Sequence, residues 1–128
     1  MSIRIFALAT LFFVVALSGP TMPSLAAEAK GHLTEREALT LLRQTIQNDS
    51  LYESWIRIDC LQYWTDSSNE THFDFAVREK HGGICTGDPL TNPVIDRFCI
   101  MRGTKALLWY DLTNDVFISY DPQKIIRK

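Results

Sequence analysis

Residues 73–80 read FDFAVREK, residues 81–93 read HGGICTGDPLTNP and residues 94–101 read VIDRFCIM. The first and third segments have the composition of strands, whereas the middle segment is rich in glycine, proline and polar residues that favour turns. These residues therefore predict a β-hairpin with a long loop, which gathers most of the side chains that can carry chemistry.

The segments on either side of this hairpin predict one helix and three further strands. Thr34 and Glu37 form a capping box, and Leu39, Leu42 and Ile46 follow at helical spacing until residues 48–50 end the helix. The period then changes from helical to alternating. The expected strands cover residues 55–63, 71–80, 94–101, 105–111 and 116–120, and the second should point Phe73, Phe75 and Val77 inward and His72, Asp74 and Arg78 outward.

A helix followed by an antiparallel meander predicts an α+β domain. We expect one N-terminal amphipathic helix packed on a curled antiparallel sheet of four or five strands. This plan resembles the cystatin-like folds, which host enzymes, inhibitors and binding modules alike. The fold class therefore does not select a function.

Residues 1–26 have the pattern of a secretory signal peptide, and residues 27–128 then form a single domain. Arg4 precedes an apolar run over residues 5–17, and small residues follow at Ser24-Leu25-Ala26-Ala27. The run is shorter than the roughly 20 apolar residues that a membrane-spanning helix needs. A retained membrane anchor is the alternative. We expect an exported protein, in the bacterial periplasm or secreted, without a membrane span after cleavage.

The charge balance argues against a nucleic-acid partner. The chain has 13 Lys and Arg against 15 Asp and Glu, and cleavage removes only one basic residue, Arg4. The basic residues form no patch of the kind that neutralises phosphates. We expect no cofactor, and a protein partner in the periplasm; the oligomeric state stays open.

The three cysteines, Cys60, Cys85 and Cys99, allow one disulfide and one remaining thiol in an oxidising compartment. Three pairings are possible. We favour Cys85–Cys99, since a loop that folds back on its own hairpin brings these two close. Cys60 is then a buried free thiol within a strand. No histidine lies at ligand spacing from a cysteine, so the sequence predicts no metal site.

Candidate catalytic residues lie around the glycine-rich turn. His81, with Asp88 or Glu79 to orient it, has the makings of a general base. Against this, Asp88 before proline is an ordinary turn residue, and no serine or cysteine has the context of an activated nucleophile. A structural role is favoured for all three.

Candidate binding residues are Arg78, His81, Asp88, Arg97 and Trp109. Arg78 is expected either to pair with Asp96 across the strands or, with Arg97, to hold an anionic ligand. Trp109, with Trp55 and Tyr63, lies either on a concave binding face or beneath the helix. The sequence does not separate these alternatives.

Four short segments resemble a known motif: VREKH at residues 77–81, CTGDP at residues 85–89, Pro93, and DRF at residues 96–98. They look like a motif of a group of small exported bacterial proteins of unassigned activity, over residues 74–115. The resemblance implies export and implies no reaction.

Two classes of function remain. The first is a non-enzymatic exported binding protein, of inhibitor or immunity type, that presents residues 80–92 to a protein partner. The alternative is a small hydrolase or lyase, or a small-ligand carrier, with a cavity in the curled sheet that uses His81 and Asp88. The first is favoured because the sequence has no nucleophile, metal or cofactor signature.

Overall fold

The computed structural model describes residues 31–126, so the expected signal peptide, residues 1–26, lies outside the described residues. None of the helices in this range is long and apolar enough to cross a membrane. The elements in chain order are α1 (Glu35–Asn48), the short 3-10 helix η1 (Ile58–Cys60), β1 (Leu61–Ser68), β2 (His72–Glu79), β3 (Val94–Met101), β4 (Leu107–Asp111), β5 (Val116–Ser119) and α2 (Pro122–Ile126).

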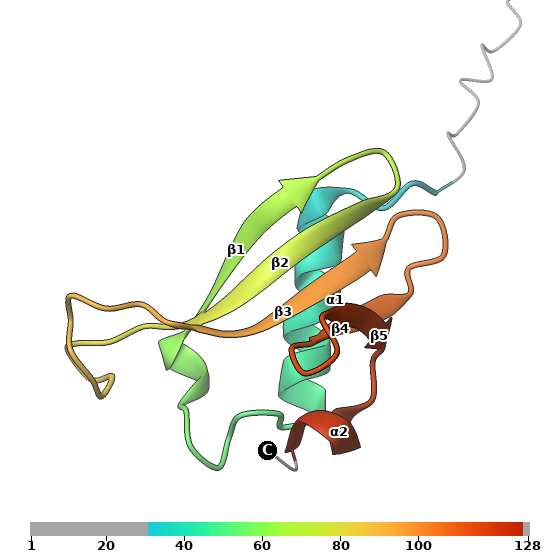
Figure 1. Cartoon of the computed structure of the whole chain (residues 1–128). Helices are drawn as coiled ribbons and strands as arrows, with labels where there is room; N and C mark the ends of the chain where they lie inside the picture. Colours follow the sequence, from blue (N-terminus) through green and yellow to red (C-terminus); the bar gives the residue numbers. More distant parts are fainter. Residues whose placement is uncertain (1–30, 127–128) are drawn as a thin grey trace, which may run out of the picture.

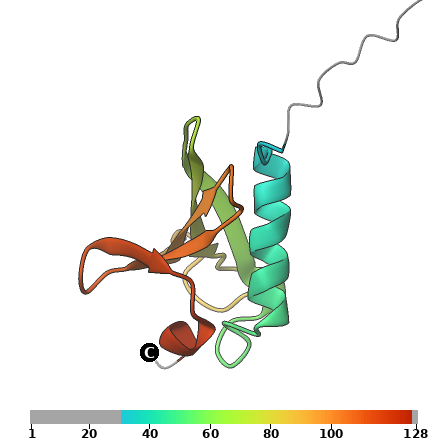
Figure 2. The same cartoon turned by 90° about the vertical axis from the view of Figure 1, so that its right-hand side faces the viewer.

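The five strands form one antiparallel sheet in the order β1-β2-β3-β4-β5, so each strand pairs with its neighbour in the chain. Helix α1 lies along one face of this twisted sheet, and the β4–β5 hairpin bends away from the helix (Figures 1 and 2). The predicted α+β class, with a helix followed by an antiparallel meander, is confirmed. We call the sheet face that points away from α1 the outer face.

Helix α1 begins and ends where its capping residues predict. The Thr34 side chain accepts a hydrogen bond from the Glu37 backbone N–H, and the Glu37 carboxylate accepts one from the Thr34 backbone N–H. This reciprocal pair satisfies amide groups that the first turn leaves open. Ala38, Leu42 and Ile46 are buried against the sheet. The capping box therefore sets the start of the helix that covers the core.

The core lies between α1 and the sheet. Phe73, Phe75 and Val77 on β2 are buried as the alternating pattern predicts, and Phe98 and Ile100 on β3 join them. In the register, Phe75 lies opposite Phe98 and Phe73 lies opposite Ile100. Since side chains alternate along a strand, the residues between them point to the outer face.

The first predicted strand starts too early. The chain from Leu51 to Arg57 forms turns, η1 follows, and β1 begins at Leu61 rather than at Trp55. The backbone N–H groups of Trp55 and Ile56 both bond to the Tyr52 carbonyl. Helical turns bury Leu51, Tyr52 and Ile56, so the apolar residues of this segment meet the core without a strand. The alternation of apolar residues from Trp55 to Cys60 therefore does not mark a strand.

The predicted Cys85–Cys99 disulfide is wrong. The bridge joins Cys60 to Cys85, which are 25 residues apart with a Cα–Cα distance of 5.7 Å, and Cys99 is a buried free thiol. Cys99 lies within β3 opposite Asp74, whose side chain faces away from α1, whereas Cys85 folds back toward η1. A backbone bond of 2.7 Å from Lys80 N–H to the Cys60 carbonyl holds this approach. The strand geometry thus separates the pair that the sequence favoured.

Candidate functional site

The β2–β3 connection, residues 80–93, extends past the ends of the strands and forms the most prominent projection of the molecule (Figure 1). We call it the hairpin loop. Cys85 ties it to η1 through the disulfide, and Gly82 and Cys85 exchange backbone hydrogen bonds of 3.0 and 3.1 Å. The loop is long, yet its two halves and its base are fixed by covalent and hydrogen bonds.

His81 joins the two arms of the hairpin loop. Its Nδ1 lies 2.6 Å from the Thr91 hydroxyl and 3.2 Å from the Asp88 carbonyl oxygen. The Thr91 hydroxyl donates its own proton to the Asp88 carbonyl at 2.8 Å, so it accepts from His81 Nδ1–H. On the other side of the ring, Nε2 lies 3.4 Å from a Glu79 carboxylate oxygen. Nδ1 is therefore bonded within the loop, whereas Nε2 faces the carboxylate at the end of the strand.

Gly87 allows the loop to close over this ring. Its φ is +105°, in a region that side chains disfavour, and a Cβ at this position would lie 2.6 Å from three atoms of the His81 ring. Close packing of the backbone against the imidazole thus requires glycine here. Of the glycines in this turn, Gly87 packs against His81 and Gly82 packs against Pro89.

The geometry does not support an acid–base role for His81, Asp88 and Glu79. The Asp88 carboxylate accepts a hydrogen bond from the Leu90 backbone N–H at 2.9 Å, so it caps a turn, and only its carbonyl approaches His81. Glu79 is near His81, as its spacing predicted. A general base needs a nitrogen that can reach a substrate proton, whereas here Thr91 is bonded to Nδ1, Glu79 lies beside Nε2 and the His81 side chain is only 13% exposed.

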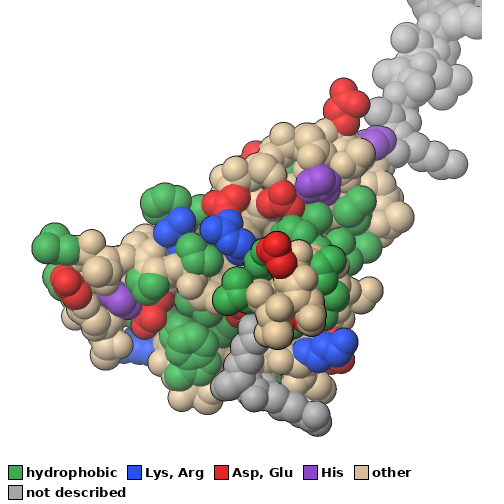
Figure 3. Space-filling model, viewed as in Figure 1, with side chains coloured by type: hydrophobic (Ala, Val, Ile, Leu, Met, Phe, Trp, Pro, Cys, Tyr) green, Lys and Arg blue, Asp and Glu red, His purple; other side chains and the backbone are tan. Residues whose placement is uncertain are grey.

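Large apolar side chains are exposed at this end of the molecule. Leu90 and Ile84 on the hairpin loop are 93% and 68% exposed, and Trp55 in the neighbouring turn is 60% exposed. We call these three side chains the loop surface. Trp55 and Ile84 line a shallow hollow of about 100 Å³ between the two segments. Figure 3 shows hydrophobic side chains at the tip of the projection. Neighbouring exposed apolar side chains, such as Trp55 and Ile84 here, are typical of protein interaction sites.

Trp55 also lines the largest described hollow, of about 480 Å³. Its walls come from the turns before η1, from β3 and from α2, and they include Leu51, Tyr52, Ile95, Asp96, Ile125 and Ile126. The hollow opens beside the loop surface, so an apolar side chain of a partner has a place to insert there.

The expected Arg78–Asp96 pair does not form. Asp96 turns toward α1 and accepts hydrogen bonds from the Tyr52 hydroxyl and from Trp109 Nε1, each at 2.9 Å. Arg78 lies on the outer face, where its guanidinium stacks 4.7 Å from the ring centre of Trp64 and donates to the Asn92 carbonyl. A register shift after Val77 places Arg78 opposite Val94 instead. The bulge therefore separates the two charges.

Arg97 is also on the outer face, but its partner is Asp66 on β1. The guanidinium groups of Arg78 and Arg97 each have a partner within the sheet, so the structure does not gather them around one anion. Figure 3, which looks onto the outer face, shows charged and histidine side chains spread over the strands.

The aromatic residues expected on one face are separated. Trp109 is buried beneath α1 beside Asp96, and Tyr63 packs under the Arg43 guanidinium at 5.0 Å. Trp55 is exposed in the turn before η1. The sequence allowed these residues to lie either beneath the helix or on an exposed face. Trp109 is buried on the helix side of the sheet, and Trp55 is exposed.

The loop surface contains residues that the sequence reasoning missed. Leu90 and Ile84 each stand alone among polar and glycine residues, at TGDPLTNP and GGIC. An apolar residue inside a turn segment has no strand or helix to bury it, so its isolation was the available signal.

The buried Tyr52 predicts a loss of stability at alkaline pH. Burial, and then the Asp96 carboxylate, raise the pKa of Tyr52 above its usual value of 10.0. The folded protein keeps this proton, whereas the unfolded chain releases it, so stability is full below pH 10 and declines above it. The slope from this group approaches about 1.4 kcal/mol per pH unit. Urea unfolding at several pH values from about 8 to about 11 measures this decline in the free energy of unfolding. Tyr52→Phe should be less stable at pH 8 but show a shallower alkaline decline, and an equal decline in both proteins would contradict the assignment.

Comparison of the chain with protein-family models, with curated proteins and with solved structures gave no match.

Proposed function

We propose that this protein is an exported, non-enzymatic binding protein that presents its hairpin loop to a protein partner in the periplasm. The observation that carries the proposal is the exposure of Leu90 and Ile84 on a loop that a disulfide ties to the domain. Water-exposed leucine and isoleucine lower the solubility of a free protein, and their burial in a partner supplies binding free energy.

The rigidity of the loop supports the same proposal. Association costs free energy for every segment that becomes ordered on binding, so a loop that is already ordered binds more tightly for the same contacts. Cys85, the His81–Thr91 bond and the turn at Asp88 hold the hairpin loop in one shape before a partner arrives. The disulfide also fits the oxidising compartment that the signal peptide predicts.

The alternative of a hydrolase or lyase has less support. It requires His81 to exchange a proton with a substrate, yet Thr91 and Glu79 occupy both sides of the ring. In the described hollow of about 480 Å³, the carboxylate of Asp96 already accepts two hydrogen bonds from Tyr52 and Trp109. These groups serve the packing of the hairpin loop and the core.

We extend the proposal to the fold. One helix followed by a five-stranded antiparallel meander agrees with the plan of the cystatin-like folds. Such a plan hosts inhibitors as well as enzymes and binding modules. Fold likeness alone assigns no partner.

Variants at the loop surface test the proposal. The full chain carrying an affinity tag is expressed with Ile84→Glu or Leu90→Glu, and proteins retained from periplasmic extract are compared with those retained by the wild type. Each glutamate places a charge in the apolar contact, and we expect affinity to fall by about tenfold or more. Leu112→Glu is the matched control, because Leu112 is 76% exposed in the β4–β5 turn.

The outcomes separate binding at the loop from other roles. A partner retained by the wild type and the Leu112 variant, but lost with both loop variants, supports the proposal. A partner retained equally by all four proteins places the interface elsewhere. Retention of no partner by the wild type contradicts a stable protein complex and favours a ligand in the hollow beside Trp55.

A further inference from the structure

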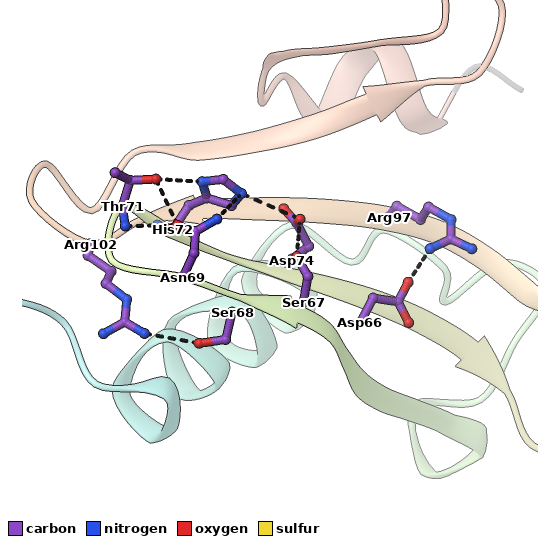
Figure 4. Close-up of polar contacts among 9 residues, drawn as sticks. All are labelled: Asp66, Ser67, Ser68, Asn69, Thr71, His72, Asp74, Arg97 and Arg102. Atoms are coloured by element: carbon purple, nitrogen blue, oxygen red, sulfur yellow. Dashed lines mark hydrogen bonds and ion pairs between the residues drawn. The ribbon is translucent and has the colours of Figure 1, made fainter.

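A second group of side chains lies on the outer face, away from the hairpin loop. His72 and Asp74 stand two residues apart on β2, and Cys99 faces Asp74 from β3. One imidazole nitrogen, one carboxylate oxygen and the thiol sulfur all lie within 4.8 Å of one another. Figure 4 shows the His72 ring and the Asp74 carboxylate turned toward each other. The structure therefore gathers three different metal-ligating atoms at one point.

The neighbours of His72 leave the correct nitrogen available to a metal. The Thr71 hydroxyl donates to Asn69 Oδ1 at 2.8 Å, so it accepts the hydrogen bond from His72 Nδ1 at 2.9 Å. Nδ1 therefore carries the proton, and Nε2 presents a lone pair beside Asp74, 3.5 Å from its Oδ2. A hydrogen bond on the far ring nitrogen is the support that metal-binding histidines usually have. The Asn69 side-chain amide, 3.2 Å from Nε2, is the group that an ion would displace.

Asp74 is also prepared for a ligand. Its Oδ2 accepts a hydrogen bond from the Ser67 hydroxyl on β1, which orients the carboxylate. Its Oδ1 is buried and has no hydrogen-bond partner of good geometry within residues 31–126. Buried carboxylate oxygens are normally satisfied, and here the Cys99 thiol offers the Asp74 carboxylate a weak hydrogen bond. The free thiol of Cys99 is buried beside the same carboxylate, and burial and a hydrogen bond to Asp74 raise the pKa of the thiol to about 12, so a bound ion would have to displace the thiol proton.

We propose that His72, Asp74 and Cys99 form a binding site for Zn²⁺, with a water molecule in the fourth position. Nitrogen, oxygen and sulfur are the donors that Zn²⁺ takes in proteins, at about 2.0–2.3 Å, and tetrahedral donors around it are about 3.5 Å apart. The donor atoms lie up to 4.8 Å apart, so the side chains must rotate toward one another when the ion binds. Bound Zn²⁺ balances one carboxylate and one thiolate, so the site carries no net charge.

The three donors lie at different depths below the surface. His72 and Asp74 are partly exposed and form the rim, whereas Cys99 forms the floor. The nearest cationic side chains have partners of their own: Arg97 pairs with Asp66, and Arg102 donates to Ser68 (Figure 4).

The three residues do not form a recognisable metal-binding motif in the sequence. His72 and Cys99 are far apart in the chain, with the whole hairpin loop between them. Only the pairing of β2 with β3 brings them together. The ligands join neighbouring strands, so a bound ion also ties β2 to β3.

Titration with Zn²⁺ alone tests the proposal, in competition with a colorimetric chelator and with Co²⁺ as a spectroscopic probe. The full-length chain is expressed, and the purified product is compared with Cys99→Ser, His72→Gln and the control His32→Gln. We expect one Zn²⁺ per chain in the wild type and the control, and an affinity lower by about a hundredfold in the other two variants. Co²⁺ should give a thiolate charge-transfer band that Cys99→Ser abolishes.

Thermal melts separate ligand loss from misfolding. Saturating Zn²⁺ should raise the melting temperature of the wild type and of His32→Gln, but not that of Cys99→Ser, which should melt cooperatively. Absence of saturable binding by the wild type overturns the proposal. So does an unchanged charge-transfer band in Cys99→Ser, because the metal would then be held elsewhere. If Cys99→Ser does not fold, His72→Gln decides through the same titration.

Discussion

Replacement of both Cys60 and Cys85 by serine is expected to lower the free energy of unfolding by about 3.5 kcal/mol. The bridge closes a loop between residues 25 apart, and chain entropy in the unfolded state sets this magnitude. A domain of this size has a total stability of about 5–15 kcal/mol, so the loss is a large fraction of it. Urea unfolding of the variant and the wild type under oxidising conditions measures the difference.

A reducing agent provides the matched control for this experiment. The reduced wild type should lose about the same free energy as the double variant, and the variant itself should not respond to the reductant. Peptide mapping of the oxidised wild type should find Cys60 linked to Cys85. Equal stability of the oxidised wild type and the variant, or a bridge that includes Cys99, would contradict the assigned pairing.

Phe75→Ala is expected to destabilise the fold by about 4 kcal/mol. Phe75 is completely buried on β2, where its ring stacks on Phe73 at 6.1 Å and lies opposite Phe98. Truncation removes apolar contacts and leaves a cavity beneath α1 that neighbouring strands cannot collapse to fill. Thermal and urea unfolding of the variant measure the loss.

Phe117→Ala is the control for the same truncation at the sheet edge. Phe117 on β5 is half-buried and contacts Tyr110 at 5.2 Å between ring centres. We expect a loss less than half of that for Phe75. Similar losses at the two positions would show that the core does not lie between α1 and the middle strands.

The burial of Phe75 could be predicted from the sequence, whereas the disulfide pairing could not. The inward position of Phe75 follows from alternation along a strand, a local property, and the capping box of Thr34 is likewise local. The disulfide depends on how the hairpin loop folds back across η1, which no local pattern encodes. Cys99 was close to Cys85 in sequence, yet the strand aims its side chain at the outer face.

In the candidate sites, too, local features could be predicted and contacts between distant segments could not. His81 and Asp88 lie in the hairpin loop and Glu79 at the end of β2, but the contact between His81 and Thr91 depends on the closure that Gly87 permits. The separation of Arg78 from Asp96 depends on a bulge after Val77, and single-residue shifts in register are not visible in composition. Contacts between distant segments decided each of these cases.

Photo-crosslinking in living cells tests the central claim most directly. The full chain is expressed with a photoreactive amino acid at Leu90 on the hairpin loop or, as a control, at Leu112 in the β4–β5 turn; both side chains are exposed. After irradiation, position 90 should yield a crosslink to one periplasmic protein, and position 112 should yield none. A crosslink from position 112 alone, or none from position 90, would contradict a binding role for the hairpin loop.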